Sequence, residues 1–392
     1  MLCRTCLRAQ KRLGASAARA QRRAASSPGG SSDGTQTTPR DTVIFSGIQP
    51  TGVPHLGNYL GALRQWVRLQ DEPEAVVPGG VGAKRLLYSI VDLHAITMPQ
   101  QADKLRQWRR EALAALLAIG LDPERSIIFY QSSVPAHSEL MWILSCTASM
   151  GYLSRMTQWK SKLHLAEDAS LQDEKARSAL KLGLFSYPVL QAADILVHRA
   201  THVPVGEDQR QHLEFARECA TNFNHAFGPH LVAPETILSP ARRIMSLQQP
   251  NQKMSKSATD PRSRILLTDT PAEIRKKIMG ALTDSTNAVS YDPVNRPGVS
   301  NLLELLSIFG EGNGGKSAAE LAEEMGSSNL GQLKARVADA VLEGIGGVRE
   351  RFLDFLERDD GKYLDRVEAE GARKANASAQ ETMELVRAAV GL

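Results

Sequence analysis

This chain has little cysteine, no long apolar run, and no acidic residue in its first 32 positions. Four of its 392 residues are cysteine, and Cys3 and Cys6 lie in the acid-free stretch. Beyond that stretch only Cys146 and Cys219 remain, and a lone Cys-x-x-Cys pair cannot complete a four-ligand zinc site. No apolar run reaches the roughly 20 residues needed to span a bilayer. We therefore expect no structural disulfide, no zinc site and no membrane partner.

The acid-free stretch is rich in arginine, alanine and serine. Its seven basic residues are Arg4, Arg8, Lys11, Arg12, Arg19, Arg22 and Arg23. This composition is typical of a mitochondrial transit peptide, although a disordered basic tail or an RNA-binding arm would share it. The Ser/Gly/Thr/Pro-rich residues 26–40 favour a disordered joint. We predict that residues 1–40 are a transit peptide with its joint, and that the protein is located in the mitochondrial matrix.

Net charge supplies no argument for nucleic-acid binding. The formal charge of +4 includes the seven basic residues of the leader, and without them it becomes −3. Any RNA contact must therefore come from local basic patches, and we expect no DNA partner.

Apolar strands alternate with helical patterns in the first part of the chain. Strand-like runs begin at residue 43 and lie at residues 86–91 and 126–130, with amphipathic helices between them. Such alternation predicts a parallel sheet covered on both faces, with ligands beyond the carboxyl ends of its strands. We predict a Rossmann-like α/β catalytic domain at residues 41–240. His94 follows the second strand, where it could border a ligand or be a satisfied structural histidine.

Helical signals dominate the last part of the chain. Thr270 and Glu273 form a predicted capping box with a proline between them, and turns at residues 288–299 precede a series of leucine-rich helical patterns. We predict a linking region at residues 241–290, followed by an all-helical domain at residues 291–392. An ordinary helical cap would have the same composition.

A loop with two lysines, Lys253-Met254-Ser255-Lys256-Ser257, follows a strand-like run within the linking region. Long lysine stems carry compact charges that can follow a polyphosphate as its charge moves during reaction. A solvated surface turn is the alternative interpretation of such a short segment.

A second candidate phosphate site follows the first strand. The Gly- and Pro-rich residues 46–54 lead into a helix, so that backbone N–H groups and the positive end of the helix dipole are available to an anion. His55 and Asn58 lie one turn apart on the same side of that helix. Together with the lysine loop they could hold a nucleotide from both ends.

This pair of motifs resembles the two signatures of class I aminoacyl-tRNA synthetases. The lysine loop matches the KMSKS motif letter for letter, whereas the first motif departs from HIGH, with Leu56 for isoleucine and Asn58 for the final histidine. The resemblance implies that His55, Asn58, Lys253 and Lys256 are catalytic, with ATP and Mg²⁺. It implies ATP contacts at Gln49, Pro50, Thr51, Gly57, Asn58, Gly206, Glu207, Asp208, Ile244, Lys253, Met254, Ser255, Lys256 and Ser257.

The helical segment that begins at Tyr187 bears on specificity. Tyr187, Gln191 and Asp194 share one face, and an aspartate in such apolar surroundings needs a partner, either a structural cation or a ligand donor. The segment resembles the amino-acid-recognition helix of tryptophanyl-tRNA synthetases, in which this aspartate accepts the indole N–H. The resemblance implies a tryptophan pocket formed by Phe45, His94, Tyr187, Gln191, Asp194 and Gln209.

The resemblance covers the chain from about residue 43 to its end, and the leader favours the mitochondrial form. It implies tryptophanyl-adenylate formation, transfer to tRNA(Trp), an anticodon-binding role for the helical domain, and a homodimer. Tyrosyl-tRNA synthetases are the nearest alternative, but they typically have a tyrosine where Phe45 stands. A metabolite nucleotidyltransferase and an inactive RNA-binding relative are rivals from other functional classes.

Overall fold

The computed structural model describes residues 41–392, apart from 73–82, 164, 167–168, 207–208, 239–242, 257 and 311–314. The predicted leader and joint at residues 1–40 lie outside the described residues. Five strands form one parallel sheet in the order β3-β2-β1-β4-β5. They are β1 (Thr42–Ile48), β2 (Lys84–Ile90), β3 (Ile127–Tyr130), β4 (His202–Val205) and β5 (Glu235–Leu238). The predicted α/β fold class is confirmed.

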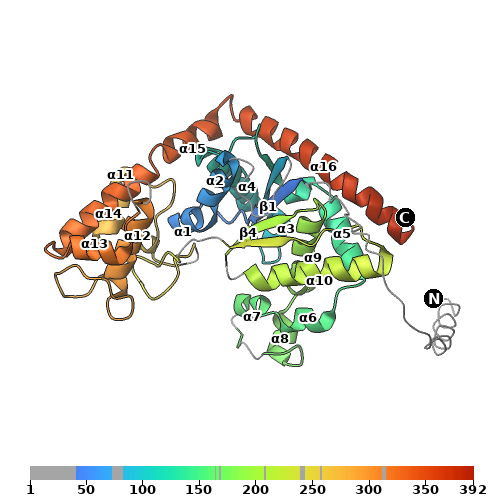
Figure 1. Ribbon diagram of the computed structural model, residues 1–392, viewed down its shortest axis with the longest axis horizontal. Helices are drawn as coiled ribbons and strands as arrows, with labels where there is room; N and C mark the ends of the chain where they lie inside the picture. The colour runs from blue at the N-terminus through green and yellow to red at the C-terminus, as the bar shows by residue number, and fades with distance from the viewer. Residues whose placement is uncertain are drawn as a thin grey trace, which may run out of the picture. The chain divides into compact units, whose positions relative to one another are not determined.

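Alternate residues of the strands face two different apolar cores. Ile44 and Tyr88 belong to one core, whereas Phe45 and Leu87 belong to the other. Because side chains of a strand point alternately to its two faces, the near-continuous apolar run of each central strand is buried on both sides. The sheet is therefore the middle of three layers (Figure 1).

Helices cover both faces of the sheet. The first core is closed by α1 (Leu56–Asn58), a π-helical turn η2 (Tyr59–Leu63), α2 (Arg64–Asp71) and α4 (Ala102–Ala118). The second is closed chiefly by α5 (Ala136–Ser145), α9 (Leu182–Leu196) and α10 (Arg210–Phe227). Short elements connect them: α3 (Asp92–Ala95), η4 (Gln131–Ser133), α6 (Met150–Arg155), α7 (Gln158–Lys162) and α8 (Glu174–Ala179). Within the described residues, no helix is long and apolar enough to cross a membrane.

The C-terminal part is helical, as predicted. After a 3₁₀ turn η6 (Pro261–Ser263) it contains α11 (Pro271–Met279), α12 (Pro297–Phe309), α13 (Ala318–Glu324), α14 (Leu330–Gly344), α15 (Val348–Glu357) and α16 (Lys362–Val390). The predicted capping box is present, because Thr270 accepts a bond from the Glu273 backbone and the Glu273 carboxylate accepts one from the Thr270 backbone. The boundaries proposed at residues 240 and 290 stay predictions.

The last helix, α16, returns to the catalytic sheet and crosses its β3 edge (Figure 1). Leu364 near its start packs in the first core, whereas Met383 near its end packs in the second. At the crossing a Cβ on Gly371 would lie 1.8 Å from the carbonyl oxygen of Ile128, so only glycine permits this approach. The helix thereby covers an edge strand that would otherwise expose unpaired backbone groups.

Candidate active site

The two predicted nucleotide loops lie at the point where the strand order reverses. The central strand β1 has β2 on one side and β4 on the other, and the crevice between such strands is the usual ligand site of open parallel sheets. Residues 49–54 follow β1, and Gly206 follows β4. Glu207 and Asp208, which the sequence predicts to contact ATP, lie outside the described residues. Within the first loop the Thr51 amide donates to the Gln49 carbonyl at 2.9 Å, closing a tight turn that contains Pro50.

His55 caps the helix that starts at Leu56. The Asn58 amide N–H donates to His55 Nδ1 at 3.3 Å, and the His55 amide donates to Asn58 Oδ1 at 3.1 Å. Burial and the charges of Lys256, Arg264 and Lys253 lower the pKa of His55 to about 4. The imidazole is therefore neutral at physiological pH, and because Nδ1 accepts, its proton sits on Nε2. His55 thus offers one N–H donor, and Asn58 keeps its side-chain NH₂ as a second.

The backbone joins the two motifs directly. The Leu56 amide donates to the Ile265 carbonyl at 2.8 Å, and the Leu267 amide donates to the Pro54 carbonyl at 3.0 Å. These bonds pair the segment after the lysine loop with the segment before α1. A Cβ on Gly57 would lie only 2.9 Å from the His55 ring and 3.6 Å from Met254, so glycine lets the two motifs pack closely.

Lys256 reaches across to the loop after β1. Its Nζ donates to the Gly52 carbonyl at 2.7 Å and lies 3.5 Å from the Thr51 hydroxyl. Gly52 has φ of +97°, a backbone conformation that favours glycine and turns this carbonyl toward the lysine. Burial lowers the pKa of Lys256 to about 8, against the opposing influence of Glu111. A weakly hydrated ammonium group thus sits beside the predicted phosphate loop.

The other predicted members of the lysine loop are placed differently. Lys253 is exposed, and with Ser255 it lines a hollow of about 620 Å³ formed by the loop. Ile244 and Met254 are buried in the first core, as most apolar residues at such positions are. Ser257 lies outside the described residues.

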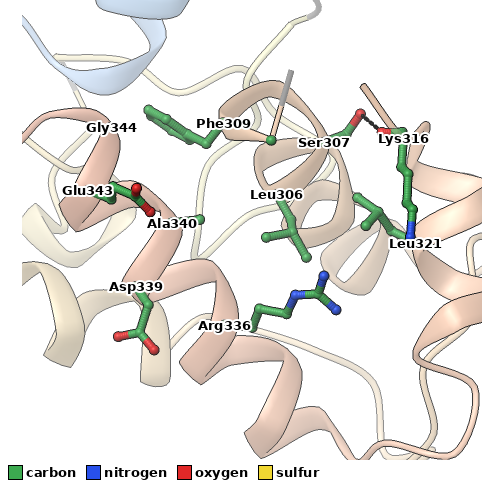
Figure 2. Close-up of a pocket in the computed structure, with 11 residues that line it drawn as sticks. Leu306, Ser307, Phe309, Lys316, Leu321, Arg336, Asp339, Ala340, Glu343 and Gly344 are labelled. Atoms are coloured by element: carbon green, nitrogen blue, oxygen red, sulfur yellow. Dashed lines mark hydrogen bonds between the residues drawn. The ribbon is translucent and has the colours of Figure 1, made fainter. Parts of the chain in front are cut away.

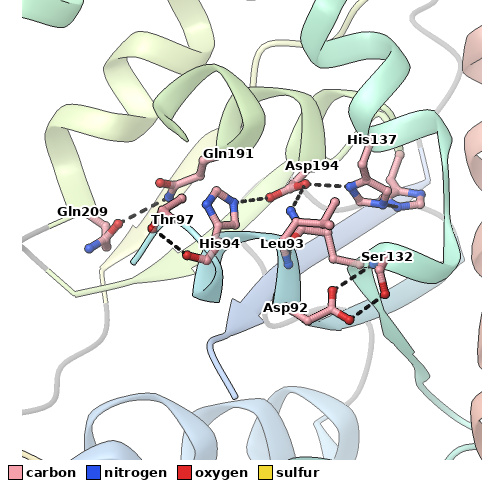
Figure 3. Close-up of polar contacts among 11 residues, drawn as sticks. Asp92, Leu93, His94, Thr97, Ser132, His137, Gln191, Asp194 and Gln209 are labelled. Atoms are coloured by element: carbon pink, nitrogen blue, oxygen red, sulfur yellow. Dashed lines mark hydrogen bonds and ion pairs between the residues drawn. The ribbon is translucent and has the colours of Figure 1, made fainter. Parts of the chain in front are cut away.

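Asp194 on α9 is 1% exposed and accepts three hydrogen bonds (Figure 3). His94 Nε2 contacts its Oδ2 at 2.8 Å, while Gln131 Nε2 and His137 Nδ1 both contact Oδ1 at 2.7 Å. Burial alone would raise the pKa of Asp194, but the bonds from His137 and His94 outweigh it and hold that pKa well below its usual range. The carboxylate is ionised, and since it can accept about four hydrogen bonds, Oδ2 retains one open acceptor position.

The remaining residues of the predicted tryptophan pocket surround this cluster. The ring of Tyr187 meets that of His94 edge-on, with 6.0 Å between ring centres. Gln191 Nε2 donates to Gln209 Oε1 at 3.3 Å (Figure 3). Tyr187 also shares a hydrogen bond of 2.6 Å with His212 Nε2. Phe45 on β1 is buried in the second core, to which Tyr187 also belongs, and its ring stacks on that of His198 with 5.8 Å between ring centres.

Sequence reasoning missed several polar residues of this region. Gln131 and His137 follow β3, and Asp92 follows β2, where it accepts bonds from the backbone and hydroxyl of Ser132 at 2.9 and 2.6 Å. Arg109 forms an ion pair with Asp92 at 2.9 Å. For Asp92 and Gln131 the available signal was their position just beyond the carboxyl ends of parallel strands, since such ends meet at one rim. Arg109 in α4 and His137 in α5 carried no such signal.

A separate cavity of about 560 Å³ lies among α12, α13 and α14 (Figure 2). None of the predicted catalytic, ATP or tryptophan residues lines it. Lys316 and Arg336 at this cavity are both paired with Glu324, at 2.5 and 2.8 Å. The cavity therefore belongs to the helical region and is distinct from the site at the sheet.

Comparison with known proteins identifies the family. The family model described as tRNA synthetases class I (W and Y) matches residues 37–344, most of the chain. The chain belongs to this family. Among curated proteins, the mitochondrial tryptophan–tRNA ligase of Schizosaccharomyces pombe is 44% identical over 354 residues, covering 89% of this chain and 95% of that protein.

Solved structures of class I synthetases agree with this family. The tryptophanyl-tRNA synthetase of Mycoplasma pneumoniae is 30% identical with a TM-score of 0.75, covering 90% of this chain and 98% of that one. The synthetase of Campylobacter jejuni, solved with ADP and tryptophan, is 31% identical with a TM-score of 0.70, covering 90% of this chain and all of that one. The architecture described above is therefore that of a class I synthetase.

Proposed function

We propose that this chain is the enzyme that attaches tryptophan to its tRNA in mitochondria, with ATP as the energy source. The observation that carries the proposal is the placement of two kinds of site at one rim of the parallel sheet. Donors from His55 and Lys256 gather at the loop after β1, and a buried carboxylate lies beyond β2 and β3. The relatives named tryptophan–tRNA ligase support the same assignment.

The reaction takes place in two steps. A carboxylate oxygen of tryptophan attacks the α-phosphorus of ATP, the bond to the β-phosphate breaks, and pyrophosphate leaves from tryptophanyl-adenylate. A terminal ribose hydroxyl of the tRNA then attacks the carbonyl carbon, and AMP leaves. Because the substrates carry the reacting groups, the protein's task is to position them and to stabilise charge on the phosphates.

The nucleotide end supplies the charge stabilisation. In this proposal His55 Nε2 and the Asn58 amide donate to the phosphates, while Lys256 and Lys253 neutralise the departing pyrophosphate. Lys256 would exchange its bond to the Gly52 carbonyl for one to phosphate. Mg²⁺ would be held through the phosphate oxygens of ATP, because it prefers oxygen ligands that include substrate phosphates.

The amino-acid end supplies selectivity. The open acceptor position on Asp194 Oδ2 suits an indole N–H, and a substrate without that donor would leave the position unpaired. Tyrosine would bring a hydroxyl rather than an indole N–H, and Phe45 offers it no hydrogen-bond partner. Tryptophan is therefore the proposed substrate.

We also propose how the chain binds tRNA, where it is located and how it assembles. The helical region at residues 291–392 would bind the anticodon end of tRNA(Trp), and the N-terminal stretch would direct the chain to the mitochondrial matrix. A homodimer is supported by exposed apolar side chains on adjoining helices: Trp142 of α5 is 72% exposed, Met150 of α6 62%, and Leu182 of α9 78%. A second copy of the chain would bury these side chains, since exposed apolar patches on adjoining elements commonly mark protein–protein contacts.

The test is exchange of labelled pyrophosphate into ATP, measured with tryptophan and with tyrosine, followed by charging of tRNA(Trp). We expect exchange and charging with tryptophan alone. Exchange with tyrosine instead would assign the chain to the tyrosyl enzymes. Exchange with neither amino acid would contradict adenylate formation and favour an inactive RNA-binding relative.

A further inference from the structure

A chain of buried hydrogen bonds continues from Asp194 to the C-terminal helix. His137 bonds Asp194 through Nδ1, and its Nε2 lies 3.2 Å from Nε2 of His198. His198 Nδ1 lies 3.2 Å from the hydroxyl of Ser378 on α16. Each of these four side chains is at most 5% exposed. A polar path therefore links the candidate tryptophan pocket to a helix 180 residues further along the chain than His198.

With both rings neutral, one arrangement of protons satisfies every bond in this path. His137 donates from Nδ1 to the Asp194 carboxylate, and its Nε2 is then an acceptor. His198 must then donate from Nε2 and accept at Nδ1, and Ser378 must donate its hydroxyl proton. Burial lowers the pKa of His198 well below its usual range, consistent with a neutral His198 ring. In this arrangement Asp194 sets the tautomer of His137, His137 sets that of His198, and the Ser378 hydroxyl supplies the donor for His198 Nδ1.

The rings in the path have little freedom to move. His198 stacks on Phe45 at 5.8 Å and meets Phe129 edge-on at 5.5 Å. His137 lies 5.1 Å from His198 between ring centres and 5.8 Å from Phe129. These contacts set the planes of both imidazoles, and the hydrogen bonds set which nitrogen carries each proton.

The helix at the far end is anchored on both sides of Ser378. Before it, Asn376 donates from Nδ2 to the Ser133 carbonyl at 2.8 Å, and Gly371 packs against β3. After it, Arg387 donates to both carboxylate oxygens of Glu139 on α5 at 2.6 Å each. A bidentate pair of this kind defines orientation as well as energy. Ser378 is therefore held in place by contacts that do not involve the pocket.

We propose that His137, His198 and Ser378 are positioning residues for tryptophan selection. They orient the Asp194 carboxylate and occupy Oδ1, so that its open acceptor position on Oδ2 is presented to the indole N–H. The inference rests on the proposed function, because it assigns these residues to the same amino-acid site. It also gives α16 a role in substrate choice in addition to its role in packing.

The decisive variant is Ser378→Ala, which removes one hydroxyl and leaves the helix intact. Without the hydroxyl, His198 Nδ1 has no donor, so the His198 ring and its bond to His137 are held less firmly and the orientation of the Asp194 carboxylate is less well defined. In pyrophosphate exchange by the full-length protein we expect the KM for tryptophan to rise on the order of tenfold, the equivalent of one hydrogen bond. The KM for ATP and the kcat should stay within about twofold.

Thr382→Val is the matched control. Thr382 lies one turn beyond Ser378 on α16, is fully buried, and its hydroxyl has no hydrogen-bond partner among the described residues. Removing that hydroxyl should leave the KM for tryptophan unchanged. An equal rise in both variants would overturn the proposal, because it would reduce Ser378 to a packing role.

A substrate analogue separates positioning from general damage. β-(3-Benzothienyl)alanine has sulphur where tryptophan has the indole N–H, so it cannot use the Asp194 acceptor. Ser378→Ala should lower kcat/KM for tryptophan and leave that for the analogue unchanged, so that discrimination falls about tenfold. An equal loss for both substrates would contradict the proposed role.

His198 offers a second, independent link. His198→Gln retains a donor and an acceptor, whereas His198→Leu retains neither. We expect the glutamine variant to keep more of the tryptophan selectivity than the leucine variant, and identical behaviour of the two would count against a hydrogen-bonded path.

If the unmodified protein shows no tryptophan-dependent exchange, the proposed function itself fails. In that case ¹⁵N-histidine NMR still tests the path, since Ser378→Ala should shift the Nδ1 resonance of His198, which loses its hydrogen bond.

Discussion

The two ends of the candidate active site are built in opposite ways. The nucleotide end consists of loop backbone and a lysine whose pKa is about 8, and its contacts are to groups that a substrate can replace. The amino-acid end is a carboxylate that is 1% exposed and already holds three side-chain donors. One end is adaptable, and the other is preorganised.

The difference follows from the task of each end. Negative charge moves from the α-phosphate toward pyrophosphate during adenylate formation, so its partners must follow it, and flexible lysines suit that purpose. The indole of tryptophan does not change during the reaction. Selection at that end depends on an acceptor whose position and charge are held constant, because an unpaired buried acceptor penalises the wrong substrate.

The largest effect is expected from Asp194→Asn. The amide cannot satisfy His94, Gln131 and His137 as the carboxylate does, because its NH₂ would face a donor. We expect kcat/KM for tryptophan in pyrophosphate exchange to fall about 10³-fold, with the KM for ATP nearly unchanged. A similar rise in the KM for ATP would mean that the two ends are not independent.

Gly371→Ala tests whether the amino-acid end depends on α16. A Cβ there would clash with the Ile128 carbonyl at 1.8 Å, so the helix must shift. We expect a loss of about 3 kcal/mol in the free energy of unfolding, measured by denaturant titration. Relative to wild type, the KM for tryptophan should rise more than the KM for ATP. The control is Gly183→Ala on α9, where a Cβ meets no atom within 4 Å and stability should not fall. Equal effects of the two substitutions would contradict the close approach.

Lys256→Ala addresses the adaptable end. Loss of a charge that stabilises pyrophosphate should lower kcat for exchange on the order of 10²-fold while leaving the KM for tryptophan unchanged. Lys334→Ala is a matched control, because Lys334 Nζ also donates to a backbone carbonyl, that of Ala281 at 2.8 Å, but lies in the helical region. If both variants lost activity equally, the contact of Lys256 would have only a structural role.

The smallest effect is a pH dependence confined to the nucleotide end. Lys256 is protonated below about pH 8 and loses its charge above it, so kcat for exchange should decline by up to tenfold per pH unit above that value. Lys256→Arg should move this decline to higher pH, because a guanidinium stays charged.

Selectivity for tryptophan over the benzothienyl analogue should stay constant from pH 6 to about 8, since the depressed pKa of Asp194 keeps it ionised. A selectivity change in that interval would contradict the fixed charge.

The fold class, the C-terminal helices and the two predicted nucleotide motifs could all be read from the sequence. Local signals sufficed there: apolar runs of strand length, the Thr270–Glu273 capping box, and short motifs whose residues lie close together in the chain. Tryptophan as substrate came from the resemblance around Asp194, and the comparisons agree with it.

Only the tertiary structure decided what surrounds Asp194 and where the last helix lies. His94, Gln131, His137, His198 and Ser378 come from five separate segments, and no local pattern in the chain links them. Their meeting depends on how parallel strands bring their carboxyl ends to one rim and on the single glycine that lets α16 cross β3. A buried charge must find its partners wherever packing places them, and packing joins residues that are distant in sequence.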